Sequence, residues 1–182
     1  MKLSTNGYIE LASYEGVAKS PYLDSVGVKT WSVGLTKSDI PDLASWPWDQ
    51  EQNLDYCFEE FKNKVQKYVD GVNSALKVAQ LQFQFDALVS ITYNIGIAGM
   101  TNSTFMRDIN NGGNENAIVA AWKAWDRGGG RVIQGLENRR ERECNLYVNG
   151  MYSNNGSIQL ITVNPATHRE EGGKDIPVSQ YF

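Results

Sequence analysis

The stretch YEGVAKSPYLDSVGVKTWSVGLT, residues 14–36, decides the fold and raises the question of function. It is half apolar and interrupted by glycine, yet it carries two isolated carboxylates, Glu15 and Asp24, and a threonine, Thr30, six positions after the second. Its β-branched and aromatic residues predict short strands, and the Ser-Val-Gly sequence at 25–27 predicts the turn between them. We therefore expect a hairpin or small sheet, with Asp24 flanking the turn and Thr30 on the returning strand.

Helices are predicted on both sides of this hairpin. Residues 4–14 predict a short helix that Ser4 or Thr5 caps and Gly16 ends. Glu15 then lies at the C-terminal end of that helix, where the negative end of the helix dipole favours a protonated carboxyl over a carboxylate. After a loop at 37–49, apolar residues recur at steps of three and four. They predict helices over about 50–69 (capped by Asp49), 79–94 (ended by Gly96 and Gly99), 103–110, 114–125 and 135–148.

These elements predict an α+β fold in which a small N-terminal lobe with a β-hairpin packs on a larger, mostly helical lobe. We expect a cleft between the lobes. The main domain is placed at residues 1–149, with the small lobe at about 15–48 and the helical lobe at about 49–149. Residues 150–182 are expected to form a polar C-terminal extension with a possible edge strand at 157–164. We expect deletion of residues after about 155 to leave the fold largely intact.

Composition excludes several classes of function. The 182 residues carry a net charge of −4, which gives no support for nucleic-acid binding. No apolar run is long enough to span a bilayer, and the first residues lack the apolar core of a signal peptide, so we expect no stable membrane anchor. Cys57 and Cys144 lie far apart with no C-x-x-C motif. We expect reduced, partly buried thiols, and a disulfide between them stays open as the alternative.

The single histidine limits the available chemistry further. His168 lies in the polar tail, where we expect it to be solvated. Zinc hydrolase sites draw on two or more histidines, and Ser-His-Asp or Cys-His catalysis needs one in the site. We therefore expect no metal and no cofactor, and the remaining chemistry is mostly that of carboxylates.

Two carboxyl groups in unlike environments are the minimum equipment for hydrolysing a glycosidic bond. One is protonated and gives its proton to the departing sugar oxygen, and the other is ionised and activates a water or attacks the sugar. Glu15 fits the first role by its place at the helix end. Asp24 fits the second because a turn exposes it, and the Thr30 hydroxyl can hold the water. The spacing alone is weak support, because most such pairs are surface charges.

The same stretch resembles the active-site signature of phage-type lysozymes, glycoside hydrolase family 24, to which the T-even phage lysozyme and many endolysins belong. That signature is Glu, eight residues, Asp or Cys, five residues, Thr, and Glu15, Asp24 and Thr30 meet the count in full. Two later segments also resemble the family, YNIGIAGMTNSTFM at 93–106 and AAWKAWDRGGGRVIQGLENRRERECNLY at 120–147. The resemblance covers roughly the first 149 residues, and it implies that the domain at 1–149 is a lysozyme-like catalytic domain.

The chain departs from this family at identifiable positions. Family members often have Thr-x-Gly-x-Gly-His-Thr after the turn, whereas this chain has TWSVGLT, with Ser32 and Leu35 in place of Gly and His. We expect these positions to be structural, so that the departures alter the support of the hairpin more than they affect activity. The net acidity is also unusual for endolysins, which tend to be basic.

The resemblance implies an endolysin that hydrolyses the β-1,4 bond between N-acetylmuramic acid and N-acetylglucosamine in bacterial peptidoglycan, for lysis of the host cell. The reaction would invert the anomeric centre, with Glu15 protonating the leaving oxygen while Asp24 and Thr30 hold the attacking water. The resemblance also implies a monomer that depends on a holin-type membrane pore. Such a protein is in the host bacterial cytoplasm until lysis and then in the periplasm or cell wall.

A further group of residues is predicted to contact the sugar. These candidates for binding N-acetyl groups are Asn94, Thr101, Asn102 and Ser103, although helix termination and capping account for them equally well. Trp122 and Trp125 are at helical spacing and are expected in the core more than as sugar platforms.

Structural and functional alternatives stay open. Glu15 could pair with an arginine such as Arg139 or Arg142, and Thr30 could be only a good strand residue. The chain could also be a virion-associated or secreted antibacterial muramidase, which differs in delivery. A catalytically silent peptidoglycan-binding module is the third alternative, and the intact set of three residues argues against it.

Overall fold

The computed structural model describes all residues, 1–182, and contains six α-helices, three two-stranded antiparallel sheets and two short 3-10 helices. The helices are α1 (Thr5–Ser13), α2 (Leu54–Ala75), α3 (Gln82–Thr101), α4 (Thr104–Asn110), α5 (Glu115–Lys123) and α6 (Gln134–Asn149). The strands are β1 (Ala18–Leu23), β2 (Lys29–Ser32), β3 (Arg127–Gly128), β4 (Arg131–Val132), β5 (Ser157–Val163) and β6 (Glu170–Pro177). The 3-10 helices are η1 (Leu43–Ser45) and η2 (Ser179–Tyr181).

The chain divides into two compact units. The β unit contains residues 8–65 and 154–182, and the helical unit contains residues 1–7 and 66–153. This division differs from the predicted one, which placed boundaries near residues 48 and 149. The first half of α2 groups with the hairpin, as the ring contact of Tyr56 with Trp31 illustrates, and the C-terminal residues group with it through β5.

The β unit is organised around the hairpin of β1 and β2. The two strands pair antiparallel with Tyr22 opposite Thr30, and the turn lies at 25–27. Asp24 precedes that turn and Thr30 lies on the returning strand, so the predicted hairpin is confirmed. It forms because Trp31 and Val33 are fully buried on its inner face, where β-branched and aromatic residues pack well.

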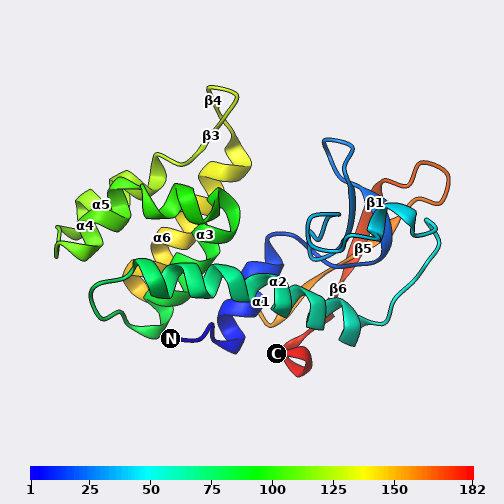
Figure 1. Cartoon of the computed structure of the whole chain (residues 1–182), viewed down its shortest axis with the longest axis horizontal. Helices are drawn as coiled ribbons and strands as arrows, with labels where there is room; N and C mark the ends of the chain where they lie inside the picture. The colour runs from blue at the N-terminus through cyan, green and yellow to red at the C-terminus, as the bar shows by residue number, and fades with distance from the viewer. The chain divides into compact units, whose positions relative to one another are not determined.

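The C-terminal residues are part of this unit. β5 pairs with β6 on one side and with Val17 on the other, where the amides of Val17 and Ile161 bond the carbonyls of Gln159 and Val17, each at 2.8 Å. Figure 1 shows β5 beside β1. Ile161 packs against Ala18 and Tyr22. The predicted strand is therefore present, with β6 on one side and a bridge to Val17 on the other. The expectation that residues after about 155 can be deleted without loss of the fold stays a prediction, and this packing argues against it.

The end of the chain adds a second contact with the unit. Tyr181 and Phe182 pack against Phe58, with ring centroids 4.7 and 5.1 Å apart. Phe182 also stacks on Tyr8 at 5.4 Å. Neither this cluster nor β6 was predicted, because the sequence EEGGKDIP of β6 has two glycines and no apolar alternation.

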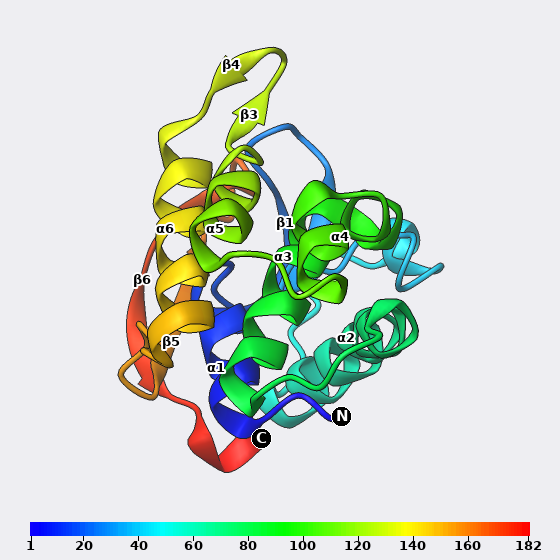
Figure 2. The same ribbon diagram turned by 90° about the vertical axis from the view of Figure 1, so that its left-hand side faces the viewer.

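The helical unit has a core of large side chains between α3, α4, α5 and α6. Figure 2 shows α5 and α6 side by side, with the β3–β4 hairpin connecting them. Phe85, Phe105 and Trp122 are fully buried, and the Trp122 ring lies 4.9 Å from Phe105 and 5.2 Å from Tyr147. The prediction that Trp122 belongs to the core is confirmed.

Two helices, α2 and α3, begin and end later than the sequence predicted, at 54–75 and 82–101. Asp49 does not cap α2, because the helix begins four residues later and the side chain of Asn53 accepts the Tyr56 amide at 2.8 Å. Gly96 takes a φ of +79° inside α3 and kinks the helix, which continues to Thr101. Gly99 does not break it. A glycine tolerates this conformation without steric cost, so the kink forms where the sequence predicted an end.

Candidate active site

Glu15 lies two residues after the end of α1, in the turn that follows the helix. The amides of Glu15 and Gly16 both donate to the Ala12 carbonyl, at 3.1 and 3.0 Å, so backbone hydrogen bonds fix this turn. Gly16 takes a φ of +70°, the left-handed conformation that favours glycine at helix ends. A Cβ at this position would approach the Gln159 carbonyl oxygen to 3.1 Å. The Glu15 side chain is half-buried.

Asp24 precedes the hairpin turn, and backbone amides hold its carboxylate. Oδ1 accepts hydrogen bonds from the amides of Val26 at 3.0 Å and Val28 at 2.8 Å. From the tail, Arg169 Nη1 donates to the Asp24 backbone carbonyl at 3.1 Å. Oδ2 accepts no hydrogen bond from the protein, so the half-buried side chain is oriented through one oxygen and keeps the other for a water or ligand.

Thr30 supplies a buried hydroxyl opposite Tyr22. Its side chain is only 3% exposed, and Oγ1 donates to the Val28 carbonyl at 3.0 Å. A hydroxyl has one proton and two lone pairs. Because Thr30 uses its proton in this bond, its remaining capacity is to accept a hydrogen bond, for example from a water.

The charges of both predicted carboxylates affect the pKa of the same phenol, that of Tyr22. Burial raises the pKa of Tyr22 well above its usual range, and the charges of Glu15, Glu170 and Asp24 raise it further. The three carboxylates belong to the β unit and act on the same phenol through their charges. Glu170 begins β6 and was missed by sequence reasoning, because its position depends on the pairing of the tail with the rest of the unit.

The other predicted residues belong to the helical unit, and capping accounts for two of them. Asn102 follows α3, and its Nδ2 donates to the Ala98 carbonyl at 2.9 Å. Ser103 caps α4 by accepting the Met106 amide at 3.0 Å. Thr101 ends α3 and is exposed.

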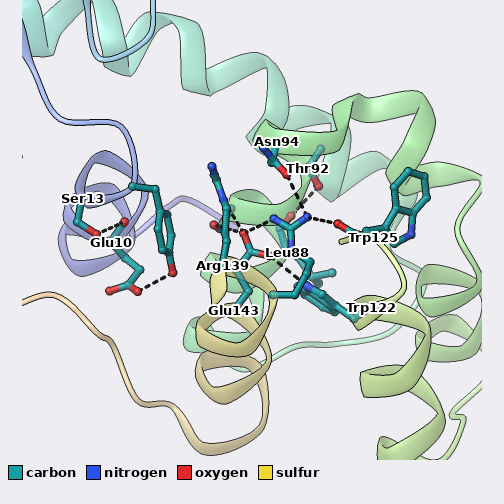
Figure 3. Close-up of polar contacts among 12 residues, drawn as sticks. Glu10, Ser13, Leu88, Thr92, Asn94, Trp122, Trp125, Arg139 and Glu143 are labelled. Atoms are coloured by element: carbon teal, nitrogen blue, oxygen red, sulfur yellow. Dashed lines mark hydrogen bonds and ion pairs between the residues drawn. The ribbon is translucent and has the colours of Figure 1, made fainter. Parts of the chain in front are cut away.

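Asn94 is held by a buried ionic network, shown in Figure 3. Glu143 is fully buried, and its Oε1 accepts from Ser90 Oγ at 2.8 Å, Arg139 Nε at 3.1 Å and Arg140 Nη2 at 3.0 Å. Arg140 Nη1 in turn donates to Asn94 Oδ1 at 3.0 Å. Burial lowers the pKa of Arg140, while Glu143 opposes that change. The exposed Asn94 amide is thus oriented with its NH₂ group left to donate.

The remaining titratable residues that the sequence singled out are structural. Cys57 and Cys144 are free and buried, as predicted, and burial raises the pKa of each thiol to about 12. His168 is not simply solvated, because its ring stacks on Trp48 with centroids 4.4 Å apart.

No three His, Cys, Asp or Glu side chains are placed to hold a metal ion. None of the helices is long and apolar enough to cross a membrane.

Both departures from the family pattern lie in the interior. Ser32 is fully buried with a φ of +54°, and its hydroxyl donates to the Cys57 carbonyl at 2.7 Å. The positive φ is the reason why glycine suits this position. Leu35 is also fully buried, and its backbone exchanges two hydrogen bonds with Trp31, both at 2.8 Å. The expectation that these positions are structural agrees with this placement.

The α+β architecture, with a hairpin that carries Asp24 and Thr30 and with Glu15 two residues after the end of α1, is that of a lysozyme-like protein. A sequence model of phage lysozymes matches residues 12–143. This chain belongs to the phage lysozyme family.

Relatives in that family come from several phages. The chain is 34% identical to an endolysin of Bacillus phage PZA over 157 residues, which are 85% of this chain and 58% of the relative. It is 33% identical to the endolysin of Salmonella phage P22, over 81% of this chain and 99% of the relative. Among solved structures, the endolysin from Escherichia coli O157:H7 phage FAHEc1 has a TM-score of 0.74 at 31% identity, covering 85% of this chain and 98% of that chain. The chain thus spans about three-fifths of the Bacillus phage relative.

Proposed function

We propose that this chain is a muramidase that hydrolyses the β-1,4 bond between N-acetylmuramic acid and N-acetylglucosamine in bacterial peptidoglycan, with inversion. The observation that carries the proposal is the Asp24 carboxylate, which the amides of Val26 and Val28 orient through one oxygen, beside a hydroxyl that can only accept. The names of the relatives, which are endolysins, support it.

The proposed roles follow from the hydrogen-bonding capacities of the three side chains. An attacking water donates one proton to Asp24 Oδ2 and its other hydrogen bond to Thr30 Oγ1, so a lone pair of its oxygen is directed at the anomeric carbon. Glu15 gives its proton to the leaving sugar oxygen. Asp24 takes the proton of the water, and the two carboxyl groups exchange states over one turnover.

The helical unit contributes sugar contacts in this proposal. The NH₂ group of Asn94 donates to an N-acetyl carbonyl, since Arg140 occupies its oxygen. Thr101 contacts the sugar with its exposed side chain. Asn102 and Ser103 support that contact by fixing the turn between α3 and α4.

The deciding experiment compares the parent protein with Glu15→Gln on purified peptidoglycan, with Glu59→Gln as a matched control. Glu59 is an exposed residue of α2 in the same unit. We expect new reducing ends from the parent and the control, and a loss of at least 100-fold with Glu15→Gln, because general acid catalysis contributes about 10²–10⁴-fold. The anomer released first, followed by NMR, reports inversion. Equal activity of all three proteins would show that the acid is misassigned.

A catalytically silent peptidoglycan-binding module is the alternative from another class. It would bind the polymer equally well as parent and as Glu15→Gln, with no turnover by either.

For delivery, we propose an endolysin that remains in the host bacterial cytoplasm until a holin-type pore admits it to the wall. Lysis timing in cells with and without a co-expressed holin tests this route against virion-associated or secreted delivery.

A further inference from the structure

One residue near the C-terminus holds the hairpin turn that carries Asp24 from outside the hairpin. Within the hairpin, the Asp24 amide donates to the Val28 carbonyl at 3.0 Å, and the Gly27 amide donates to the Asp24 carbonyl at 3.1 Å. Arg169 Nη1 donates to that same carbonyl at 3.1 Å. This is the only hydrogen bond that reaches residues 24–28 from outside the hairpin. The exposed turn therefore has one hydrogen-bonded link to the rest of the β unit.

The residue before Arg169 fixes the strand that leads into the turn. The His168 carbonyl accepts the amide of Leu23, the last residue of β1, at 2.6 Å. The His168 ring stacks on Trp48 with centroids 4.4 Å apart, and Lys29 Nζ lies 4.3 Å from the centroid of the same tryptophan. Lys29 is opposite Leu23 in the hairpin. Two consecutive residues, His168 and Arg169, thus hold the end of β1 and the start of the turn.

These two residues belong to the turn between β5 and β6, residues 164–169, which we call the tail turn. Its shape is fixed by Asn164, whose Oδ1 accepts the amides of Ala166 at 2.9 Å and Thr167 at 3.0 Å. The Asn164 amide donates to the Arg169 carbonyl at 2.8 Å. An asparagine that bonds the backbone two residues on stabilises a turn locally. The backbone of Arg169 is therefore in place before the side chain contacts the hairpin.

The bond from Arg169 acts on the main chain of Asp24 and leaves its carboxylate open. The carboxylate takes its orientation from the amides of Val26 and Val28, which donate to Oδ1. Both amides belong to the segment that Arg169 holds, so a movement of this segment moves the carboxylate with it. Displacing a catalytic group by about 1 Å can cost on the order of 100-fold in rate. A hydrolase that uses Asp24 to direct a water therefore needs this turn to stay in place.

We propose that Arg169 is a positioning residue for hydrolysis, which acts by holding the main chain at Asp24. The inference rests on the proposed function, in which Asp24 binds the attacking water. Arg169 lies beyond residues 12–143, which match the family model, so the family pattern does not assign it this role. Without the bond, the turn is held only through β1 and β2, and the water at Asp24 is aligned with the anomeric carbon for less of the time. The chemical step slows, while binding of the sugar is unchanged.

The test measures kcat and KM on soluble peptidoglycan fragments for two variants of Arg169. Arg169→Met removes the donor and keeps a long unbranched side chain, and Arg169→Lys keeps a cationic donor. Lys174→Met is the matched control, because it removes one positive charge from an exposed position on the neighbouring strand, β6. We expect Arg169→Met to lower kcat about tenfold, with KM and the urea midpoint as in the parent. Arg169→Lys recovers most of the lost activity, and the control behaves as the parent.

Three results would overturn the proposal. The first is a parental kcat in Arg169→Met. The second is an equal fall in Lys174→Met, because a general effect of charge would then account for the loss. The third is a fall in kcat that comes with a lower urea midpoint and that Arg169→Lys does not recover, because a loss of folded protein would then account for it.

Hydrogen exchange separates this inference from the proposed function. The exchange rates of the Val26 and Val28 amides, followed by NMR in ¹⁵N-labelled protein, report on the turn without any turnover. We expect both amides to exchange several-fold faster in Arg169→Met than in the parent and in Lys174→Met. Faster exchange supports the positioning role even if the parent cleaves no glycan. Parental exchange rates in Arg169→Met would overturn the inference even if the protein proves to be a muramidase.

Discussion

Removing the C-terminal residues tests how the β unit is stabilised. A chain that stops after Asn155 loses Ile158, Ile161 and Val178, which are 2%, 7% and 0% exposed. Burying one such side chain contributes about 1.5–3 kcal/mol, so the three together contribute on the order of 5–9 kcal/mol. Because the net stability of a whole domain is about 5–15 kcal/mol, we expect the truncated β unit not to fold.

Unfolding in urea, followed by near-ultraviolet circular dichroism, measures this effect, because three tryptophans lie in the β unit. A graded version uses Ile161→Ala, which we expect to cost about 2–5 kcal/mol, against Gln159→Ala on the exposed side of the same strand, which we expect to cost under about 0.5 kcal/mol. A truncated chain that unfolds cooperatively at the parental midpoint would refute the reasoning, as would equal effects of the two point variants.

Three further predictions concern single sites. Glu143→Gln lowers the free energy of unfolding by about 3–5 kcal/mol, because it leaves buried arginine charges uncompensated. The control Glu141→Gln removes a carboxylate from an exposed ion pair and lowers it by under about 1 kcal/mol. Unfolding in urea measures both variants. Gly16→Ala lowers the free energy of unfolding by about 1–2 kcal/mol, because alanine is strained at the positive φ of this position. A urea midpoint equal to that of the parent would contradict this prediction. The thiols have a pKa of 9.0 when unfolded and about 12 when buried. The unfolded state therefore loses its thiol protons first, and the free energy of unfolding falls as pH rises above 9. Replacing Cys57 and Cys144 by alanine reduces this dependence of stability on pH, which urea unfolding at several pH values measures.

The hairpin and most helices could be predicted from the sequence because their causes are local. Turn residues lie at 25–27, and Gly16 ends α1 at the position where a left-handed residue is required. Helical periodicity located α4, α5 and α6 within one or two residues. The beginning of α2 was misplaced because Asp49 and Asn53 are both suitable caps, and only the geometry of the loop selects Asn53.

The C-terminal strands could not be predicted because their causes are distant in the sequence. β6 is exposed along most of its length, so no pattern of apolar residues marks it. Its position follows from the pairing of β5 with Val17, about 140 residues earlier. The sequence therefore predicted a removable extension where the structure has a strand pair inside the β unit.

The candidate site shows the same separation between local and distant causes. Glu15, Asp24 and Thr30 lie within sixteen consecutive residues, so their spacing alone indicated them. Their surroundings do not come from that stretch. Arg169 bonds the Asp24 carbonyl, and Glu170 adds its charge to the field at Tyr22. A substitution in the tail can therefore change the electrostatic environment of the carboxylates while the motif itself stays intact.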